Sequence, residues 1–275
     1  MEFTLLLDYF FLAVTIIGNP FFWTIVSALL YWRGQETDSF FLMNTVVLAG
    51  IASGFFKSAF KALRPPENAN FSDWLEKQFY IPTNEYSFPS GHATQVSAAF
   101  AFFYSQIRKN WKIVFGAAVA LVMVSRVYLG KHYPIDVFWG LVLGLVVGKI
   151  VPWSREWFEK NAKLNTAAQR HLGIALIGIV FLAVLFLFEN LLYMSVVLGY
   201  YAGIFLFKGL NLDNQKISGK KFLAKSFVGL LGFGAIFLPA AFLLEEEALQ
   251  AIFLFFSGLW ITLIFPYLTH AKKPN

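Results

Sequence analysis

The sequence contains no cysteine among its 275 residues and few charged residues. The absence of cysteine excludes disulfide bonds, thiolate metal sites and thiol nucleophiles. Charged residues make up only 14% of the chain, whereas hydrophobic residues make up 58% and include 33 phenylalanines. A soluble domain of this length needs far more polar surface. The composition therefore predicts a polytopic membrane protein.

The sequence also shows no sign of a signal peptide or of a nucleic-acid-binding surface. The N-terminus has no basic flank followed by a small-residue cleavage site, so we expect no removable signal peptide. Nucleic-acid binding is compatible with the formal net charge of +6, but the basic residues lie in short loops between apolar runs. Membrane topology explains this distribution better, and we predict no nucleic-acid partner.

Long apolar runs are abundant instead. A bilayer core of about 30 Å needs about 20 helical residues, so the runs predict an all-α membrane bundle of nine transmembrane helices. Residues 3–17 are apolar but short and are followed by Gly18-Asn19-Pro20, which predicts an interfacial or re-entrant half-helix. The predicted spans are residues 20–33, 40–63, 92–107, 113–128, 135–151, 172–188, 190–207, 226–244 and 248–269.

Three parts are predicted along the chain. Residues 1–152 form a helical bundle that carries the polar motifs, residues 153–171 form a cytoplasmic connector, and residues 172–275 form four additional transmembrane helices without a motif. In the long loop of the first part, apolar residues recur at helical spacing over residues 71–79. This spacing predicts a short amphipathic helix on the membrane surface.

Basic residues are concentrated in alternate loops. The positive-inside rule places these loops and the C-terminus in the cytoplasm. The loop of residues 64–91 and the turn of residues 129–134 then lie outside, which in a bacterium means the outer face of the plasma (inner) membrane. The ends of adjacent helices meet at this face, so we expect the polar segments to lie together there.

Three polar segments stand out against the apolar background. They contain two of the four histidines in the chain. In order, their polar residues are Lys57 with Arg64-Pro65, then Pro89-Ser90-Gly91-His92, then Ser125-Arg126 with His132 and Asp136.

The basic residues of these segments suit a phosphate. Ionisable groups at membrane depth are costly, so Lys57 and Arg126 are functional candidates. A guanidinium matches phosphate through a bidentate fork. Gly91 at a helix start allows backbone N–H groups to approach an anion, and Ser90 can donate a further hydrogen bond.

The histidines suit group transfer. Asp136 follows His132 by four residues, so on one helix face it can accept from one ring nitrogen and leave the other free as a nucleophile. His92 can then protonate the departing oxygen. A metal site of His92, His132 and Asp136 is the alternative, although Lys57 and Arg126 nearby favour an anion over a cation.

The order Lys57-X6-Arg64-Pro65, Pro89-Ser90-Gly91-His92 and Ser125-Arg126-X5-His132-X3-Asp136 resembles the three-part signature of the type 2 phosphatidic acid phosphatase (PAP2) superfamily. This superfamily includes lipid phosphate phosphatases, prenyl diphosphatases, glucose-6-phosphatase and vanadium haloperoxidases. All three parts are complete and correctly ordered over residues 57–136. Alone, Arg64-Pro65 is better explained as the simple end of a span, and only the other two segments favour a role in the site.

The resemblance implies roles for the motif residues. It implies a phosphohistidine on His132, oriented by Asp136, with His92 as the acid for the leaving group and with no metal or other cofactor. The residues that the resemblance assigns to phosphate binding are Lys57, Arg64, Ser90, Gly91 and Arg126.

The expected function is that of an integral membrane phosphatase. Its substrate would be a lipid phosphate or a polyprenyl diphosphate in the outer leaflet. A phosphotransferase using the same phosphohistidine and a non-enzymatic lipid transporter or scaffold are the alternatives. The sequence carries no indication of the oligomeric state.

Overall fold

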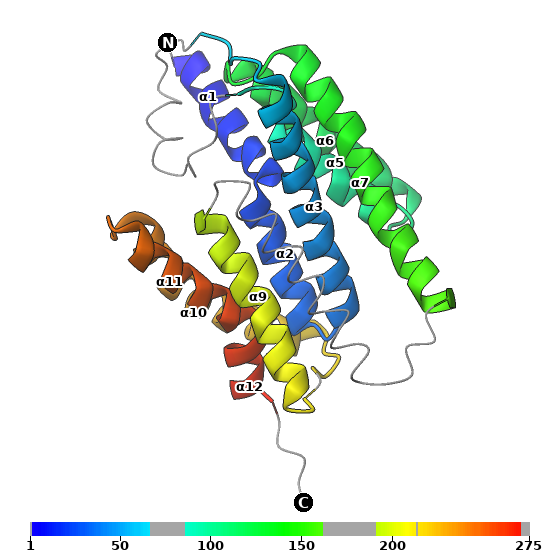
Figure 1. The fold of residues 1–275 in the computed structure, drawn as a ribbon, viewed down its shortest axis with the longest axis vertical. Coiled ribbons are helices and arrows are strands. Elements are labelled where there is room, and N and C mark those ends of the chain that lie inside the picture. The colour runs from blue at the N-terminus through cyan, green and yellow to red at the C-terminus, as the bar shows by residue number, and fades with distance from the viewer. Residues whose placement is uncertain (1, 67–85, 162–190, 213, 271–275) are drawn as a thin grey trace, which may run out of the picture. The chain divides into compact units, whose positions relative to one another are not determined.

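The computed structural model describes residues 2–66, 86–161, 191–212 and 214–270 (Figure 1). These residues are helical almost throughout, and within them the only β-type pairing is an isolated antiparallel bridge between Leu63 and Tyr86. The predicted all-helical class is therefore confirmed for the described residues. The chain divides into two compact units, residues 1–23 with 41–189 and residues 24–40 with 190–275.

The helices follow the predicted apolar runs closely. Those of the first unit are α1 (Glu2–Thr15), the 3₁₀ turn η1 (Ile16–Gly18), most of α3 (Glu36–Phe60), α5 (Gly91–Phe103), α6 (Lys109–Tyr128) and α7 (Pro134–Asn161). Those of the second unit are most of α2 (Pro20–Trp32), then α9 (Leu191–Gly209), α10 (Gly219–Phe242), α11 (Glu247–Leu259), the π-helical turn η2 (Trp260–Ile264) and α12 (Phe265–Leu268).

The predicted break after the N-terminal half-helix is confirmed. The Asn19 N–H donates to the Ile16 carbonyl at 2.9 Å and closes the 3₁₀ turn. The Asn19 side-chain oxygen then accepts from the Phe21 N–H at 2.9 Å, and Pro20 occupies the first position of α2. An Asn cap followed by Pro is a favourable helix start. The chain is bent at this break, so α1 and α2 form either one broken span or a re-entrant pair.

The predicted number of nine spans is not confirmed. Among the described residues, six helices are long and apolar enough to cross a membrane, or seven if α1 and α2 count as one span. Helix α5 has 13 residues, so it reaches only about 20 Å, less than a bilayer core of about 30 Å. The predicted span at 172–188 and the predicted amphipathic helix at 71–79 lie outside the described residues.

Helix α7 is longer than predicted. Its expected end was residue 151, but it continues through Pro152 to Asn161 and so includes the beginning of the predicted connector. The added residues are rich in Glu, Arg and Lys, which are good helix formers. The end of an apolar run marks where the helix leaves the hydrocarbon region. The helix itself continues as long as its backbone hydrogen bonds do.

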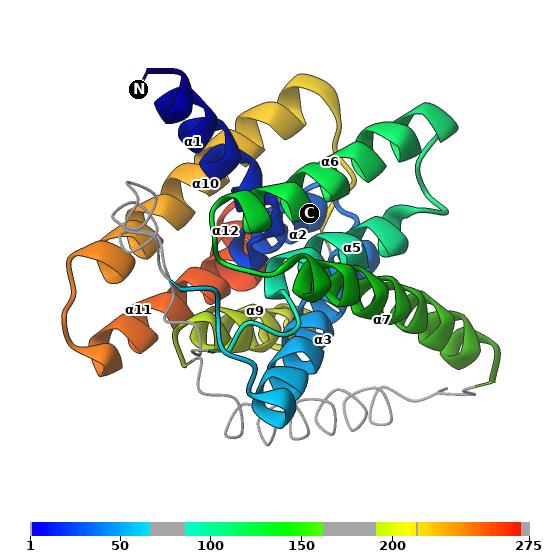
Figure 2. The ribbon, with the colours of Figure 1, turned by 90° about the horizontal axis from the view of Figure 1, so that it is seen from above.

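The first unit has a tight junction between α5 and α7 (Figure 2). A methyl group added at Gly144 would collide with the Thr94 carbonyl, and one added at Gly148 would collide with the Ala98 carbonyl. Small residues at such positions let two helix backbones approach in a membrane. The two helices are therefore in direct backbone contact along several turns.

Helix α3 completes this core. Ala49 of α3 is fully buried against Ala98 of α5 and Val147 of α7. The Gln95 side-chain amide donates to the Val46 carbonyl at 2.9 Å, which links α5 to the middle of α3. Three helices are thus fixed together below the ends that carry the polar motifs.

The second unit is held by buried hydroxyl groups. The Ser39 and Tyr200 hydroxyls lie 2.7 Å apart, and Ser27 Oγ donates to the Ser39 carbonyl at 2.7 Å. Nearby, the hydroxyls of Thr24 and Tyr193 are 3.4 Å apart. Hydroxyl pairs of this kind link helices where no water is present to replace them.

Candidate active site

Lys57 connects the end of α3 to the second polar segment. It lies in the last turn of α3 and is only 8% exposed. Its ammonium group donates to the carbonyls of Tyr86 and Ser87, the second at 3.3 Å. A buried ammonium needs such partners. Lys57 therefore holds the residues that lead into α5 against the end of α3.

The chain after α3 pairs with the chain before α5. Leu63 and Tyr86 form the isolated bridge, and the Ser87 N–H donates to the Ala62 carbonyl at 2.7 Å. The Ser87 hydroxyl lies 3.1 Å from the Leu63 carbonyl and donates to it. These bonds place the Lys57–Arg64 segment beside the Ser90–His92 segment.

Arg64 reaches the third segment. Its guanidinium donates to the Lys131 carbonyl at 3.2 Å, in the turn between α6 and α7. The turn itself is folded onto the end of α6, because the N–H groups of Lys131 and His132 both donate to the Arg126 carbonyl. Arg64 thus brings the first segment to the residues around His132.

Ser90 joins the second segment to α7. It is the N-cap of α5, and its N–H donates to the Asp136 carbonyl at 3.0 Å. The Ser90 hydroxyl accepts from the Ala93 N–H at 3.5 Å, which leaves the hydroxyl hydrogen available for donation. Gly91 follows as the first residue of α5, and a methyl group added there would meet only Ser53 Oγ, at 3.8 Å.

His132 and Asp136 lie together, but not through helix spacing. His132 lies in the turn before α7, which begins at Pro134. Its Nδ1 is 3.6 Å from Asp136 Oδ2, longer than a hydrogen bond, and has no hydrogen-bond partner among the residues that the structure describes. Asp136 Oδ2 instead accepts from the Tyr133 N–H at 2.8 Å. This bond caps α7 and holds the carboxylate beside the imidazole.

The electrostatic surroundings of His132 favour its neutral form. The side chain is 3% exposed. Burial, followed by the positive charges of Arg126, Arg64 and Lys57, holds the pKa of the His132 imidazole well below its usual value, although a backbone hydrogen bond at Ser87 opposes the shift. A neutral imidazole keeps the nitrogen lone pair that a nucleophile needs.

His92 belongs to the same cluster. It is the second residue of α5, and it lies within electrostatic range of the same three cations and of His132. The structure therefore brings all eight predicted site residues to one region at the ends of α3, α5, α6 and α7. Those residues are Lys57, Arg64, Ser90, Gly91, His92, Arg126, His132 and Asp136.

Two residues of this region were not predicted. Thr15 Oγ1 accepts from Arg126 Nη1 at 3.0 Å, and Gly18 packs against His92. In the sequence, Thr15 was only one polar position in an apolar run and Gly18 only marked a helix break. Contacts across more than 70 residues of chain leave no local signal that would identify them.

Residues 38–160 match the PAP2 superfamily, and all eight site residues fall within the match. This match and the apolar helices identify the chain as an integral membrane protein. The N-terminal helix pair, including Thr15 and Gly18, precedes the matched PAP2 segment.

Several phosphatases resemble the chain. The lipid A 4'-phosphatase of Porphyromonas gingivalis is 32% identical over 159 residues, which cover 53% of this chain and 65% of that protein. The undecaprenyl-diphosphatase of Sulfolobus acidocaldarius is 35% identical over 129 residues, or 46% of this chain and 60% of that protein. The lipid A 1-phosphatase of Rhizobium etli is 34% identical over 104 residues, which cover 38% of this chain and 44% of that protein.

The chain spans less than two thirds of the length of each of these relatives. No solved structure matches it. Within the described parts of the chain, no group of three or more His, Asp and Glu side chains is arranged to hold a metal ion.

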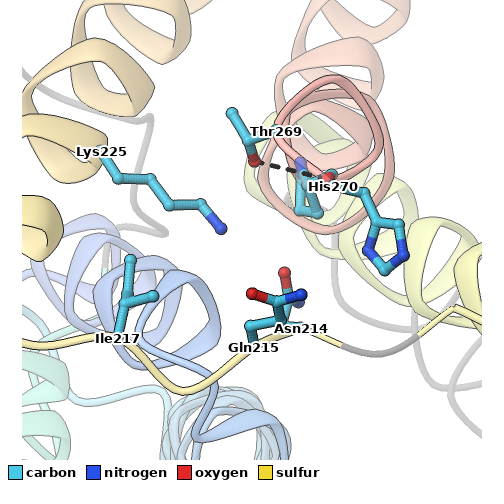
Figure 3. Close-up of a pocket in the computed structure, with 7 residues that line it drawn as sticks. Asn214, Gln215, Ile217, Lys225, Thr269 and His270 are labelled. Atoms are coloured by element: carbon cyan, nitrogen blue, oxygen red, sulfur yellow. Dashed lines mark hydrogen bonds between the residues drawn. The ribbon is translucent and has the colours of Figure 1, made fainter. Parts of the chain in front are cut away.

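A small pocket in the second unit is lined by residues that lie outside the PAP2 segment in the sequence (Figure 3). It has a volume of about 80 Å³, and the ammonium of Lys225 points into it between Gln215 and Thr269. None of its lining residues belongs to the three motifs, so it is not part of the candidate active site. The lining residues are Asn214, Gln215, Ile217, Lys225, Pro266, Thr269 and His270.

Proposed function

We propose that this chain is a membrane phosphatase that hydrolyses the terminal phosphate of a lipid phosphate or a prenyl diphosphate. The observation that carries the proposal is a buried His132 among three cations within the PAP2 segment. Relatives that are named for lipid A and undecaprenyl diphosphate support a phosphorylated lipid as the substrate class.

The cations bind the phosphate group. Lys57 and Arg126 are almost completely buried, and a buried charge is stabilised when a charge of opposite sign enters the site. Arg64 adds a third positive charge from the loop side. The start of α5 contributes backbone N–H groups and the positive end of the helix dipole at Gly91.

The first chemical step transfers the phosphoryl group to His132. Nε2 of His132, the ring nitrogen that is not beside Asp136, attacks phosphorus, a P–N bond forms and the P–O bond to the lipid breaks. The bonding electron pair leaves with the lipid oxygen, which takes a proton from His92, and such acid catalysis typically contributes about 10²- to 10⁴-fold. The positive charge that develops on His132 is balanced by Asp136, whose carboxylate lies only 3.6 Å from Nδ1.

The second step releases phosphate. A water molecule attacks phosphorus while His92, now neutral, accepts the proton of that water. The P–N bond breaks and its electron pair returns to His132. One water is consumed, the lipid leaves with one phosphate fewer, and His92 is protonated again for the next cycle. In this proposal no step uses a metal ion.

The membrane orientation forms part of the proposal. We place the active site at the extracytoplasmic face, in the plasma (inner) membrane of a bacterium, and the C-terminus in the cytoplasm. The positive-inside rule supports this assignment. The cations on the proposed cytoplasmic side include Arg33, Arg108, Lys109, Lys112, Lys208, Lys216, Lys220 and Lys221, whereas the opposite side carries Glu245, Glu246 and Glu247.

The absence of cysteine makes the orientation easy to test. In intact cells, a membrane-impermeant maleimide should label Glu246→Cys and should leave Lys109→Cys unlabelled until the cells are opened. The reverse pattern would place the active site on the cytoplasmic side.

The activity is tested by phosphate release from purified protein in detergent. The substrates are phosphatidate, phosphatidylglycerophosphate, sphingosine phosphate and undecaprenyl diphosphate, each with and without EDTA or orthovanadate. We expect release from at least one lipid, inhibition by vanadate and no effect of EDTA. Loss of activity in EDTA would contradict a metal-free mechanism. Transfer of phosphate to an added alcohol instead of water would show a phosphotransferase, and no turnover of any lipid would support a transporter or scaffold.

A further inference from the structure

The break between α1 and α2 lies against two residues of the candidate site. Thr15, the last residue of α1, contacts Arg126, and Gly18, in the turn η1, contacts His92. Both residues come from the part of the chain that precedes the PAP2 segment at residues 38–160. These two contacts therefore extend the candidate site to residues that the family match does not include.

Thr15 contributes to the orientation of Arg126. The Arg126 side chain is 1% exposed, and its Nη1 lies 3.0 Å from Thr15 Oγ1, which accepts the hydrogen bond. A buried guanidinium has five N–H donors in a rigid plane, and each acceptor helps to fix that plane. Because a hydroxyl is neutral, Thr15 can accept the bond without cancelling the positive charge that attracts phosphate.

Gly18 determines how closely the chain approaches His92. A Cβ atom at residue 18 would lie 2.7 Å from His92 Cβ, 2.9 Å from His92 Cδ2 and 2.9 Å from Val122 Cγ1. These distances are shorter than van der Waals contact, so any side chain at residue 18 must displace a neighbour. The imidazole of His92 is thus packed directly against the backbone of η1.

We propose that the break between α1 and α2 is part of the active site, where Thr15 positions Arg126 and Gly18 positions His92. This inference rests on the proposed function, because both residues act through groups that the proposed mechanism uses. The N-terminal helix pair would then be required for phosphate transfer.

The first test removes the Thr15 hydroxyl. Thr15→Val keeps the shape of the side chain, and Thr15→Ser keeps the hydroxyl. The matched control is Thr45→Val, because Thr45 is also buried but donates only to the Phe41 carbonyl of its own helix, at 2.8 Å. For the lipid phosphate that the wild type hydrolyses fastest, we expect Thr15→Val to lower kcat/KM about tenfold. Thr15→Ser should stay near wild type, and so should Thr45→Val.

The second test displaces His92 through Gly18→Ala. An acid matters most for a poor leaving group such as a lipid alcohol, and little for p-nitrophenolate, which departs without a proton. We therefore expect Gly18→Ala to lower kcat about tenfold or more for the lipid phosphate and less than about twofold for p-nitrophenyl phosphate. The control is Gly116→Ala in α6, where an added methyl group meets nothing within 4 Å.

The outcomes separate this inference from the proposed function. Equal kcat/KM values for Thr15→Val and Thr45→Val, or equal losses for both substrates in Gly18→Ala, would overturn the inference while wild-type hydrolysis still supported the function. Should the wild type hydrolyse nothing, the proposed function fails. The binding of orthovanadate, measured as a shift of the thermal unfolding midpoint, then decides the inference. It survives only if vanadate stabilises the wild type more than Thr15→Val, and it fails if vanadate stabilises neither.

Discussion

The two units of the chain bury different kinds of polar group. In the first unit the buried polar residues include the charged or ionisable Lys57, Arg126, His132 and Asp136. In the second unit, among the residues that the structure describes, the buried polar side chains are all hydroxyl-bearing: Thr24, Ser27, Ser39, Ser195, Ser226, Ser257 and Thr262. Membrane helices thus contain polar groups of two classes within one chain.

The difference follows from the free energy of each class. A charge at membrane depth is costly, so it persists where it binds a ligand or takes part in a reaction. A hydroxyl pair is inexpensive to bury and contributes about 0.6 to 2 kcal/mol to helix association. Substitutions in the first unit should therefore affect activity more than stability, and substitutions of hydroxyls in the second unit should do the reverse.

The largest expected effect is that of His132→Ala. Without the proposed nucleophile, lipid phosphate hydrolysis should fall by at least about 10³-fold. The thermal unfolding midpoint in detergent should change little. His270→Ala, outside the site, is the matched control and should retain full activity. Undiminished turnover by His132→Ala would remove the basis for the assigned nucleophile.

Asp136→Asn should have the next largest effect. The amide keeps an oxygen that can accept from the Tyr133 N–H, so the cap of α7 is preserved. The negative charge beside His132 is lost, and we expect kcat to fall about 10²-fold or more. Steady-state kinetics measure the expected fall in kcat, and circular dichroism measures whether the helix content is preserved. A parallel loss of helicity would indicate that the carboxylate acts mainly on the fold.

Tyr200→Phe tests the second unit. The change removes a hydroxyl that lies 2.7 Å from Ser39 Oγ, and we expect the free energy of unfolding to fall by about 1 kcal/mol. The kcat/KM value should stay within about twofold of wild type. Tyr267→Phe, at an exposed tyrosine, is the control and should leave both quantities unchanged. A large loss of activity in Tyr200→Phe would contradict the expectation that hydroxyls of the second unit affect stability and not activity.

The smallest expected effect is a shift of the pH profile in Arg64→Gln. The positive charge of Arg64 lowers the pKa of His132, so its removal raises that pKa toward the usual value of about 6.5. The acid limb of kcat/KM, which reports ionisations of the free enzyme, should therefore move to higher pH. Arg108→Gln, at an exposed arginine, should not move it. A shift to lower pH would contradict the proposed charge coupling.

The sequence was sufficient for most of the helices, because apolar runs in a bilayer have few alternatives to helix formation. It did not predict the continuation of α7 through Pro152 to Asn161. Hydropathy measures where a helix leaves the membrane, whereas the end of a helix depends on backbone hydrogen bonds and on capping. For the same reason the apolar run of residues 92–107 corresponds to a helix that already ends at Phe103.

The charged groups of the site could be predicted because each is individually conspicuous in an apolar chain. Lys57, Arg126 and His132 are ionisable residues in or beside apolar segments, where such residues are rare because they are costly to bury. Their neutral partners could not be predicted. Thr15 and Gly18 reach the site only through packing of η1 and the end of α1 against α5 and α6. The same limit applies to His132, which lies in a turn instead of on the helix face that its spacing indicated.

The backbone contact between α5 and α7 limits how this protein can evolve. The two helices touch at Gly144 and Gly148. The first turn of α5 carries His92, and the first turn of α7 carries Asp136. Any larger residue at either glycine would push the two helices apart, and with them His92 and Asp136, so these glycine positions are constrained together with the candidate site.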